Sequence, residues 1–313
     1  MSLTSSQIHG LIPPVITPLA DRDTLDVAGL ERLLDHLVAG GVHGIFVLGT
    51  TGEGPSLSHR LQREMVKTTA KLLGDRLPLY VGITDTSFVE GLELAKFSAD
   101  AGADAVVAAP PFYFAAGQTE LKQWFELLLA DLPLPLLLYN IPSCTKIAIE
   151  PETIEALIHH ENVIGLKDSS GDLDYLKGAV DLAARERPGW PVLVGPEHLL
   201  GDAISLGAVG GVAGGANLVP RLFVSVYEAA KTGNTAELAR LQALVTQLQE
   251  LYTIGKYGSA FLKGVKCALE LSGVCSGLLS PPFDAFHQPE RERVAEWMKS
   301  FADTGYLPAQ TTV

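Results

Sequence analysis

Short apolar runs alternate along the chain with longer amphipathic segments. Each run has four to seven residues, and apolar and polar residues do not alternate within it. This pattern is typical of strands that are buried on both faces. We expect eight such strands, at Gly10–Ile16, Gly44–Leu48, Leu79–Ile83, Ala105–Ala109, Pro135–Tyr139, Val163–Lys167, Val192–Gly195 and Ala208–Ala213.

The segments between these runs repeat their apolar residues at helical spacing. Helices are expected, among other places, at Val27–Ala39, Ser58–Leu73, Ser87–Ala101, Glu120–Ala130 and Pro151–His159. Strands that alternate with helices form βα units and a parallel sheet. Because the strands recur at a spacing of about 30 residues, a closed (β/α)8 barrel is favoured over an open sheet.

Beyond Pro220 the strand pattern stops and helical spacing continues. Four helices are expected there, at Val219–Thr232 (the last of the barrel), Thr235–Tyr252, Ser259–Ser272 and Glu290–Phe301. The sequence therefore predicts an α/β protein with a (β/α)8 TIM barrel as catalytic domain over residues 1–232. A C-terminal helical extension is expected to follow over residues 233–313.

Length and composition agree with this division. A barrel needs roughly 250 residues, and the chain has 313 residues, of which 47% are hydrophobic. The formal net charge of −13 disfavours nucleic acid and anionic membrane surfaces as partners. No apolar run reaches the ~18 residues of a membrane span, and the polar start lacks the apolar core of a signal peptide.

The metal-binding residue types show no metal-site spacing. The three cysteines, Cys144, Cys267 and Cys275, form no CxxC pair, which argues against a disulfide framework and a zinc site. The eight histidines show neither HxxxH nor HExxH. We therefore expect a cytoplasmic protein without a bound metal.

The active site of a barrel forms at the C-terminal ends of its strands. The residues at those ends are Gly49–Glu53, Pro110–Tyr113, Tyr139–Pro142, Lys167-Asp168, Gly195–His198 and Gly214–Asn217. Hydroxyl groups, phenols, an amine and glycine backbone are thus expected at one mouth. Gly49, Gly214 and Gly215 are counted as candidates for substrate binding on this ground.

Lys167 ends the run Val163–Leu166. Partial desolvation at the rim of an apolar barrel disfavours the charged form of an amine. A neutral amine can attack a ketone and form an imine. The residue type and position alone also fit a lysine that merely extends from a strand end to solvent.

Tyr139 and the Thr50-Thr51 pair each fit two interpretations. The phenol of Tyr139 can move protons for imine chemistry, or it can simply cap the core and donate a hydrogen bond. The two threonines lie in a turn with glycines on both sides. Such a turn can direct hydroxyl and N–H groups at a carboxylate, or the residues can serve the turn alone.

Together, Gly49–Glu53, Tyr139–Pro142 and Gly165–Asp168 resemble the dihydrodipicolinate synthase / N-acetylneuraminate lyase family of class I, Schiff-base, pyruvate-dependent aldolases. The resemblance extends from Gly10 to the helical tail. It implies a TIM barrel that acts on a small 2-oxo acid. It also implies a homo-oligomer, a tetramer built as a dimer of dimers, and no metal or organic cofactor.

The resemblance assigns roles to particular residues. Lys167 is similar to the lysine that forms the imine with pyruvate, and Tyr139 to the proton shuttle. Thr50 and Thr51 correspond to the residues that bind the pyruvate carboxylate, with Thr50 also in the proton relay. Tyr113 resembles the tyrosine that a synthase subunit inserts into its neighbour's site.

The chain departs from the synthases at Cys144, where they place an arginine. That arginine holds the carboxylate of aspartate semialdehyde through a fork of donors, which a thiol cannot supply. Glu197 lies in a Gly195–His198 segment that resembles the part of sugar-acid lyases that meets substrate hydroxyls. Cys144 and Glu197 are therefore the candidates for selecting the second half of the substrate.

Three functions are compatible with these residues. The first is a class I lyase, or a dehydratase, that cleaves or condenses a 2-oxo-3-deoxy sugar acid. The second is 4-hydroxy-tetrahydrodipicolinate synthase, which joins pyruvate to aspartate semialdehyde; Tyr113 favours it and Cys144 opposes it. The third is a barrel that binds 2-oxo acids without turnover, which the intact Lys167 and Tyr139 oppose.

Overall fold

The computed structural model describes residues 3–308. The chain forms two compact units, each assembled from separate stretches. The first comprises the chain up to Ile12, His43–Phe46 and Pro78–Ala213. The second comprises Pro13–Val42, Val47–Leu77 and the chain from Gly214 onward. The predicted division at residue 232 stays a prediction.

The first unit contains nearly all of one parallel sheet of eight strands. Their order is β1 (Gly10–Leu11), β10 (Gly210–Gly211), β9 (Val192–Val194), β8 (Val163–Asp168), β7 (Leu136–Asn140), β6 (Ala105–Ala108), β5 (Leu79–Gly82) and β4 (Ile45–Val47). The two edges are joined because the backbone N–H of His43 donates to the carbonyl of Leu11 at 2.7 Å. The sheet is that of a (β/α)8 barrel, as predicted.

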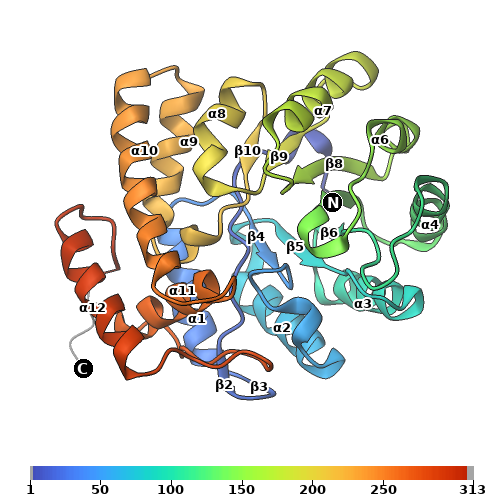
Figure 1. Ribbon diagram of the computed structural model, residues 1–313. Helices are drawn as coiled ribbons and strands as arrows, with labels where there is room; N and C mark the ends of the chain where they lie inside the picture. Colours follow the sequence, from blue (N-terminus) through green and yellow to red (C-terminus); the bar gives the residue numbers. More distant parts are fainter. Residues whose placement is uncertain (1–2, 309–313) are drawn as a thin grey trace. The chain divides into compact units, whose positions relative to one another are not determined.

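Helices follow the strands of the first unit. They are α3 (Phe88–Ala101), α4 (Gln118–Asp131), α5 (Pro142–Thr145), α6 (Pro151–Leu157), α7 (Leu173–Glu186) and α8 (Leu200–Ser205), with 3-10 turns η1 (Ser5–Gln7) and η4 (Glu197–Leu199). In Figure 1, α3, α4 and α6 lie outside β5, β6 and β8. Two of these helices begin with a side-chain N-cap: the side chain of Ser87 accepts from Glu90 N at α3, and that of Asp172 accepts from Asp174 N at α7, which satisfies otherwise free helix N–H groups.

The core of the first unit is filled by alternate residues of the strands. Leu137, Tyr139 and Ile141 belong to one buried apolar cluster with Val107 and Leu193. Because successive strand residues point to opposite faces, the residues between them face the surrounding helices. The interior of the sheet is thus packed with side chains, and only its ends can hold a ligand.

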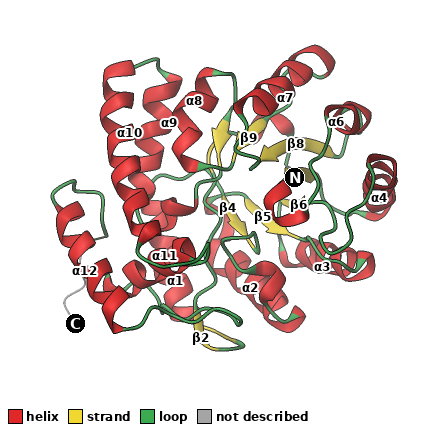
Figure 2. Cartoon of the chain, viewed as in Figure 1, coloured by secondary structure: helices red, strands yellow, loops and turns green. Residues whose placement is uncertain are grey.

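The second unit consists mainly of helices (Figure 2). They are α1 (Val27–Ala39), α2 (His59–Leu73), α9 (Pro220–Lys231), α10 (Thr235–Gln249), α11 (Ala260–Leu271) and α12 (Gln288–Ala302). Short 3-10 turns occur at η2 (Gly54–Ser56), η3 (Gly74–Arg76), η5 (Gly214–Asn217) and η6 (Glu250–Thr253), and a hairpin pairs β2 (Leu19–Asp21) with β3 (Thr24–Leu25). The predicted helical C-terminal part is confirmed.

The observed elements differ from the predicted ones in several places. The strand expected over Gly10–Ile16 ends at Leu11, because Pro13 and Pro14 have no N–H for the ladder. The helix expected over Thr235–Tyr252 ends at Gln249 and continues as η6. The β2–β3 hairpin was not predicted. Between residues 3 and 308, no helix is long and apolar enough to cross a membrane.

Candidate active site

The register of β7 and β8 places two pairs of polar residues side by side. Tyr139 is opposite Lys167, and Asn140 is opposite Asp168. Because side chains alternate between the two faces of a strand, Tyr139 and Lys167 share one face and Asn140 and Asp168 share the other. Tyr139 belongs to the buried cluster of the first unit, so the first pair is the one directed into the barrel.

The amine of Lys167 lies against two aromatic rings. Its Nζ is 3.8 Å from the centre of the Tyr139 ring and 5.0 Å from that of Phe46. The lysine is only 3% exposed. Within residues 3–308, no carboxylate forms an ion pair with it, so no salt bridge has to break before the amine reacts. The structure thus brings Lys167 and Tyr139 together as the sequence predicted, and it adds Phe46.

Asn140 and Asp168 fix the strand ends on the opposite face. Asn140 Nδ2 donates to Asp168 Oδ1 at 2.7 Å, and Ser170 Oγ donates to Asp168 Oδ2 at 2.8 Å. Asn140 Oδ1 accepts from the N–H of Ile149 at 3.0 Å. Both side chains are buried, where hydrogen bonds between polar groups are costly to lose. This pair therefore holds in place the residues that precede it, Tyr139 and Lys167.

Burial raises the pKa of Asp168, and the hydrogen bonds from Asn140 and Ser170 oppose this only in part. Because the pKa of Asp168 is raised in the folded state, its ionisation lowers the free energy of unfolding. This cost is absent below about pH 3.8, where the carboxyl is protonated in both states, and it appears as pH rises through the folded-state pKa. Asp168→Asn loses one of the accepted hydrogen bonds but cannot ionise, so its free energy of unfolding minus that of the wild type should increase as pH rises over this range. Urea unfolding between pH 3.5 and pH 7 measures this signed difference, and a value that stays constant or falls as pH rises would contradict the assignment.

Three further candidates lie in the first unit at different depths. Tyr113 is 76% exposed, and Lys146 Nζ donates to its carbonyl at 3.2 Å. Cys144 is exposed on α5. Glu197, at the start of η4, is buried at 8% exposure. Tyr113 thus projects outward, and the oligomer in which it would meet a neighbouring subunit stays a prediction.

The cysteines differ sharply in accessibility. Burial raises the pKa of Cys267 to about 11 and that of Cys275 to about 12, whereas Cys144 is exposed. Because the thiolate is the reactive form, only Cys144 should react quickly with Ellman's reagent in the native protein at pH 8. All three should react in urea, and Cys144→Ser should remove the fast phase. A second fast thiol in that variant would show that α5 is not the accessible site.

The remaining candidates belong to the second unit. Thr50 is exposed and Thr51 half-buried, in a turn closed by hydrogen bonds from Glu53 N to Thr50 O at 3.1 Å and from Gly54 N to Gly49 O at 3.2 Å. Gly214 and Gly215 are buried in η5. A Cβ on Gly214 would lie 2.4 Å from the Phe261 ring, so close packing alone requires a glycine there. Substrate binding by these five residues stays a prediction.

A barrel sheet with a buried amine against a phenol at a strand end has the features expected of an aldolase-type lyase. Residues 7–301 match the family model described as "Dihydrodipicolinate synthetase family". The chain belongs to this family, and it is a lyase, as the named members are.

Three relatives show what this chain is similar to. The solved structure of dihydrodipicolinate synthase from Bacteroides thetaiotaomicron has 50% sequence identity to this chain. Its TM-score is 0.91, and the match covers 93% of this chain and 98% of that one. A prophage protein of the dihydrodipicolinic acid synthase family from Escherichia coli K12, solved in complex with pyruvate, is 26% identical, with a TM-score of 0.88 over 94% and 99%. A probable 2-dehydro-3-deoxy-D-pentonate aldolase of E. coli is 29% identical over 86% of this chain and 88% of its own.

Proposed function

We propose that the protein is a class I lyase that forms a Schiff base between Lys167 and pyruvate or a related 2-oxo acid. The observation that carries the proposal is the contact between the buried Lys167 amine and the ring of Tyr139 at the ends of paired strands. The related E. coli protein was solved in complex with pyruvate, which supports pyruvate as one half of the substrate here. Family membership favours an enzyme over a barrel that only binds 2-oxo acids.

The proposed reaction needs a nucleophile and a proton carrier. Lys167 Nζ adds to the keto carbon, the oxygen leaves as water, and an iminium forms. In the cleavage direction, the hydroxyl on C4 loses its proton, the C3–C4 bond breaks, and its electron pair moves into the iminium to give an enamine and an aldehyde. C3 then takes a proton, and water releases pyruvate and the free amine. Tyr139 is the group assigned to these proton transfers, and no step calls for a metal or organic cofactor.

For Thr50 and Thr51 we propose the role that the resemblance implies, binding of the substrate carboxylate. Their turn presents hydroxyl and backbone N–H groups, which are the usual donors to a carboxylate. Gly49 closes the turn through its carbonyl. Thr50 is also assigned to the proton relay. The Lys167 chemistry does not depend on this assignment.

For the second half of the substrate we propose a 2-oxo-3-deoxy sugar acid. Cys144 cannot hold a second carboxylate as an arginine fork would, and the buried Glu197 can accept hydrogen bonds from hydroxyl groups while repelling an anion. The E. coli relative named as a pentonate aldolase supports this class. The 50% identity to a dihydrodipicolinate synthase favours the second candidate, condensation of pyruvate with aspartate semialdehyde.

Two assays on one preparation separate the candidates. Pyruvate release, or loss of water, is followed with a panel of 2-oxo-3-deoxy sugar acids of five and six carbons. Condensation is followed with pyruvate and aspartate semialdehyde, with the Lys167→Ala variant as the blank. We expect turnover of the sugar acids only. Turnover of the semialdehyde above the blank, with none on the panel, would select the synthase.

A further inference from the structure

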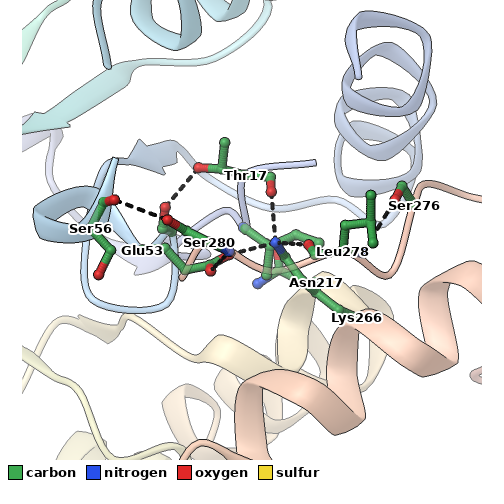
Figure 3. Close-up of polar contacts among 10 residues, drawn as sticks. Thr17, Glu53, Ser56, Asn217, Lys266, Ser276, Leu278 and Ser280 are labelled. Atoms are coloured by element: carbon green, nitrogen blue, oxygen red, sulfur yellow. Dashed lines mark hydrogen bonds and ion pairs between the residues drawn. The ribbon is translucent and has the colours of Figure 1, made fainter. Parts of the chain in front are cut away.

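The second unit contains a fully buried ion pair between two residues to which the sequence assigns no role. Lys266 on α11 pairs with Glu53, which follows the Thr50-Thr51 turn, and their side chains are 0% and 2% exposed (Figure 3). Lys266 Nζ also donates to the carbonyls of Thr17 at 2.8 Å and Leu278 at 2.7 Å. These contacts use all three N–H groups of the ammonium.

The other oxygen of Glu53 is engaged as well. Glu53 Oε2 accepts from the N–H of Ser280 at 2.7 Å, and Ser280 Oγ donates to the carbonyl of Ser56 at 2.9 Å. On the other side, Thr17 Oγ1 donates to the carbonyl of Gly52 at 2.7 Å. The end of the turn is therefore bonded to three distant segments of the second unit, as Figure 3 shows.

The turn that these contacts hold is strained. Leu48 and Glu53 have φ values of 60° and 58°, in the left-handed region that side chains disfavour. Gly54 packs so closely that a Cβ there would lie 2.1 Å from the carbonyl oxygen of Leu48. Strained residues of this kind persist only where the surroundings determine their conformation. The bonds around Glu53 and Lys266 provide that constraint.

Stability alone does not account for this pair. Burial lowers the pKa of Lys266, and Glu53 opposes the change, so desolvation of the amine is a real cost. A buried ion pair can often be replaced by apolar residues without loss of stability. The use of buried pairs that is best attested is to specify one conformation, and here the conformation is that of the turn before Glu53.

We infer that Glu53 and Lys266 are positioning residues that hold the Thr50-Thr51 turn in the form that binds the substrate carboxylate. The inference rests on the proposed function, since Thr50 and Thr51 bind the carboxylate only in that proposal. Neither positioning residue touches substrate. Their effect is on the placement of the threonine hydroxyl and N–H groups.

Glu53→Gln is the sharpest test. The carboxylate accepts from Lys266 on one oxygen and from Ser280 N on the other, whereas an amide has a single accepting oxygen. One contact must be lost while the size of the side chain is kept. Because small misplacements of binding groups are costly, we expect kcat/KM for the 2-oxo acid to fall about 10- to 100-fold, mainly through a higher KM. Hydrogen exchange of the peptide 48–57 should rise.

Two comparisons separate positioning from general loss of stability. Leu241→Ala removes a buried side chain of α10, and it should lower the melting temperature without raising KM. Lys266→Met is the second variant, and it should reproduce the effects of Glu53→Gln if it folds. At saturating pyruvate, Glu53→Gln should still be trapped at Lys167 by borohydride.

Different results would overturn the inference and the proposed function. A Glu53→Gln variant with wild-type KM, or with unchanged exchange of the peptide 48–57, overturns the inference. So does a KM that rises equally in Leu241→Ala. If the wild type is not trapped by borohydride, the proposed function is overturned and the catalytic part of the inference with it. The exchange result then still decides whether the pair holds the turn.

Discussion

The Lys167→Ala variant should fold normally and lose its activity, with kcat reduced by roughly 10⁴- to 10⁶-fold, as expected when a covalent nucleophile is removed. The residue is 3% exposed at the end of β8, and its amine is the attacking atom in the proposed reaction. Removing it leaves the substrate without an iminium to accept electrons. Steady-state assays on the substrate found by the panel, with circular dichroism as the folding check, measure the effect.

Two matched variants sharpen this prediction. Lys167→Arg keeps a cationic side chain but cannot form an imine, so it should be as inactive as Lys167→Ala. Lys177→Ala removes an exposed lysine that pairs with Asp181 on α7, and it should retain full activity. Turnover by Lys167→Arg within tenfold of wild type would mean that the lysine acts through its charge, against the covalent mechanism.

The second large effect is expected from Tyr139→Phe. This change keeps the ring that contacts Lys167 at 3.8 Å and removes only the hydroxyl. Loss of a general acid–base group typically costs about 10²- to 10⁴-fold in rate, and we expect kcat to fall in that range. Because the amine is untouched, pyruvate should still be trapped on Lys167, although more slowly.

Tyr80→Phe is the control for this change. Tyr80 is a buried phenol of the same apolar cluster, on β5 rather than at a strand end beside Lys167. Its loss of a hydroxyl should leave kcat close to wild type. Equal effects of the two substitutions, or a fully active Tyr139→Phe, would assign Tyr139 to packing and leave the proton carrier to another residue.

Much of the first unit could be predicted because strand position fixes side-chain direction. Once β7 and β8 are recognised as neighbouring strands, Tyr139 and Lys167 fall at equivalent ends. Phe46 could not be placed beside the amine in the same way, because its contact depends on the packing of β4. The buried Asn140–Asp168 bond was missed, although both residues directly follow the predicted pair.

The Glu53–Lys266 pair could not be predicted from the sequence. The two residues are 213 positions apart, and no periodicity relates a turn after one strand to a helix near the end of the chain. A signal was nevertheless present. Lys266 is the only charged residue in the otherwise apolar run Gly264–Leu269, which indicates a buried lysine, and a buried lysine almost always has a partner.

Borohydride reduction in the presence of pyruvate shows whether Lys167 forms a Schiff base. The wild-type protein is treated with borohydride with and without pyruvate and digested, and the masses of its peptides are measured by mass spectrometry. A reduced pyruvate adduct is expected on the peptide that contains Lys167, absent without pyruvate and absent in Lys167→Ala. An unmodified Lys167 peptide at saturating pyruvate, or an adduct on another lysine, would contradict it.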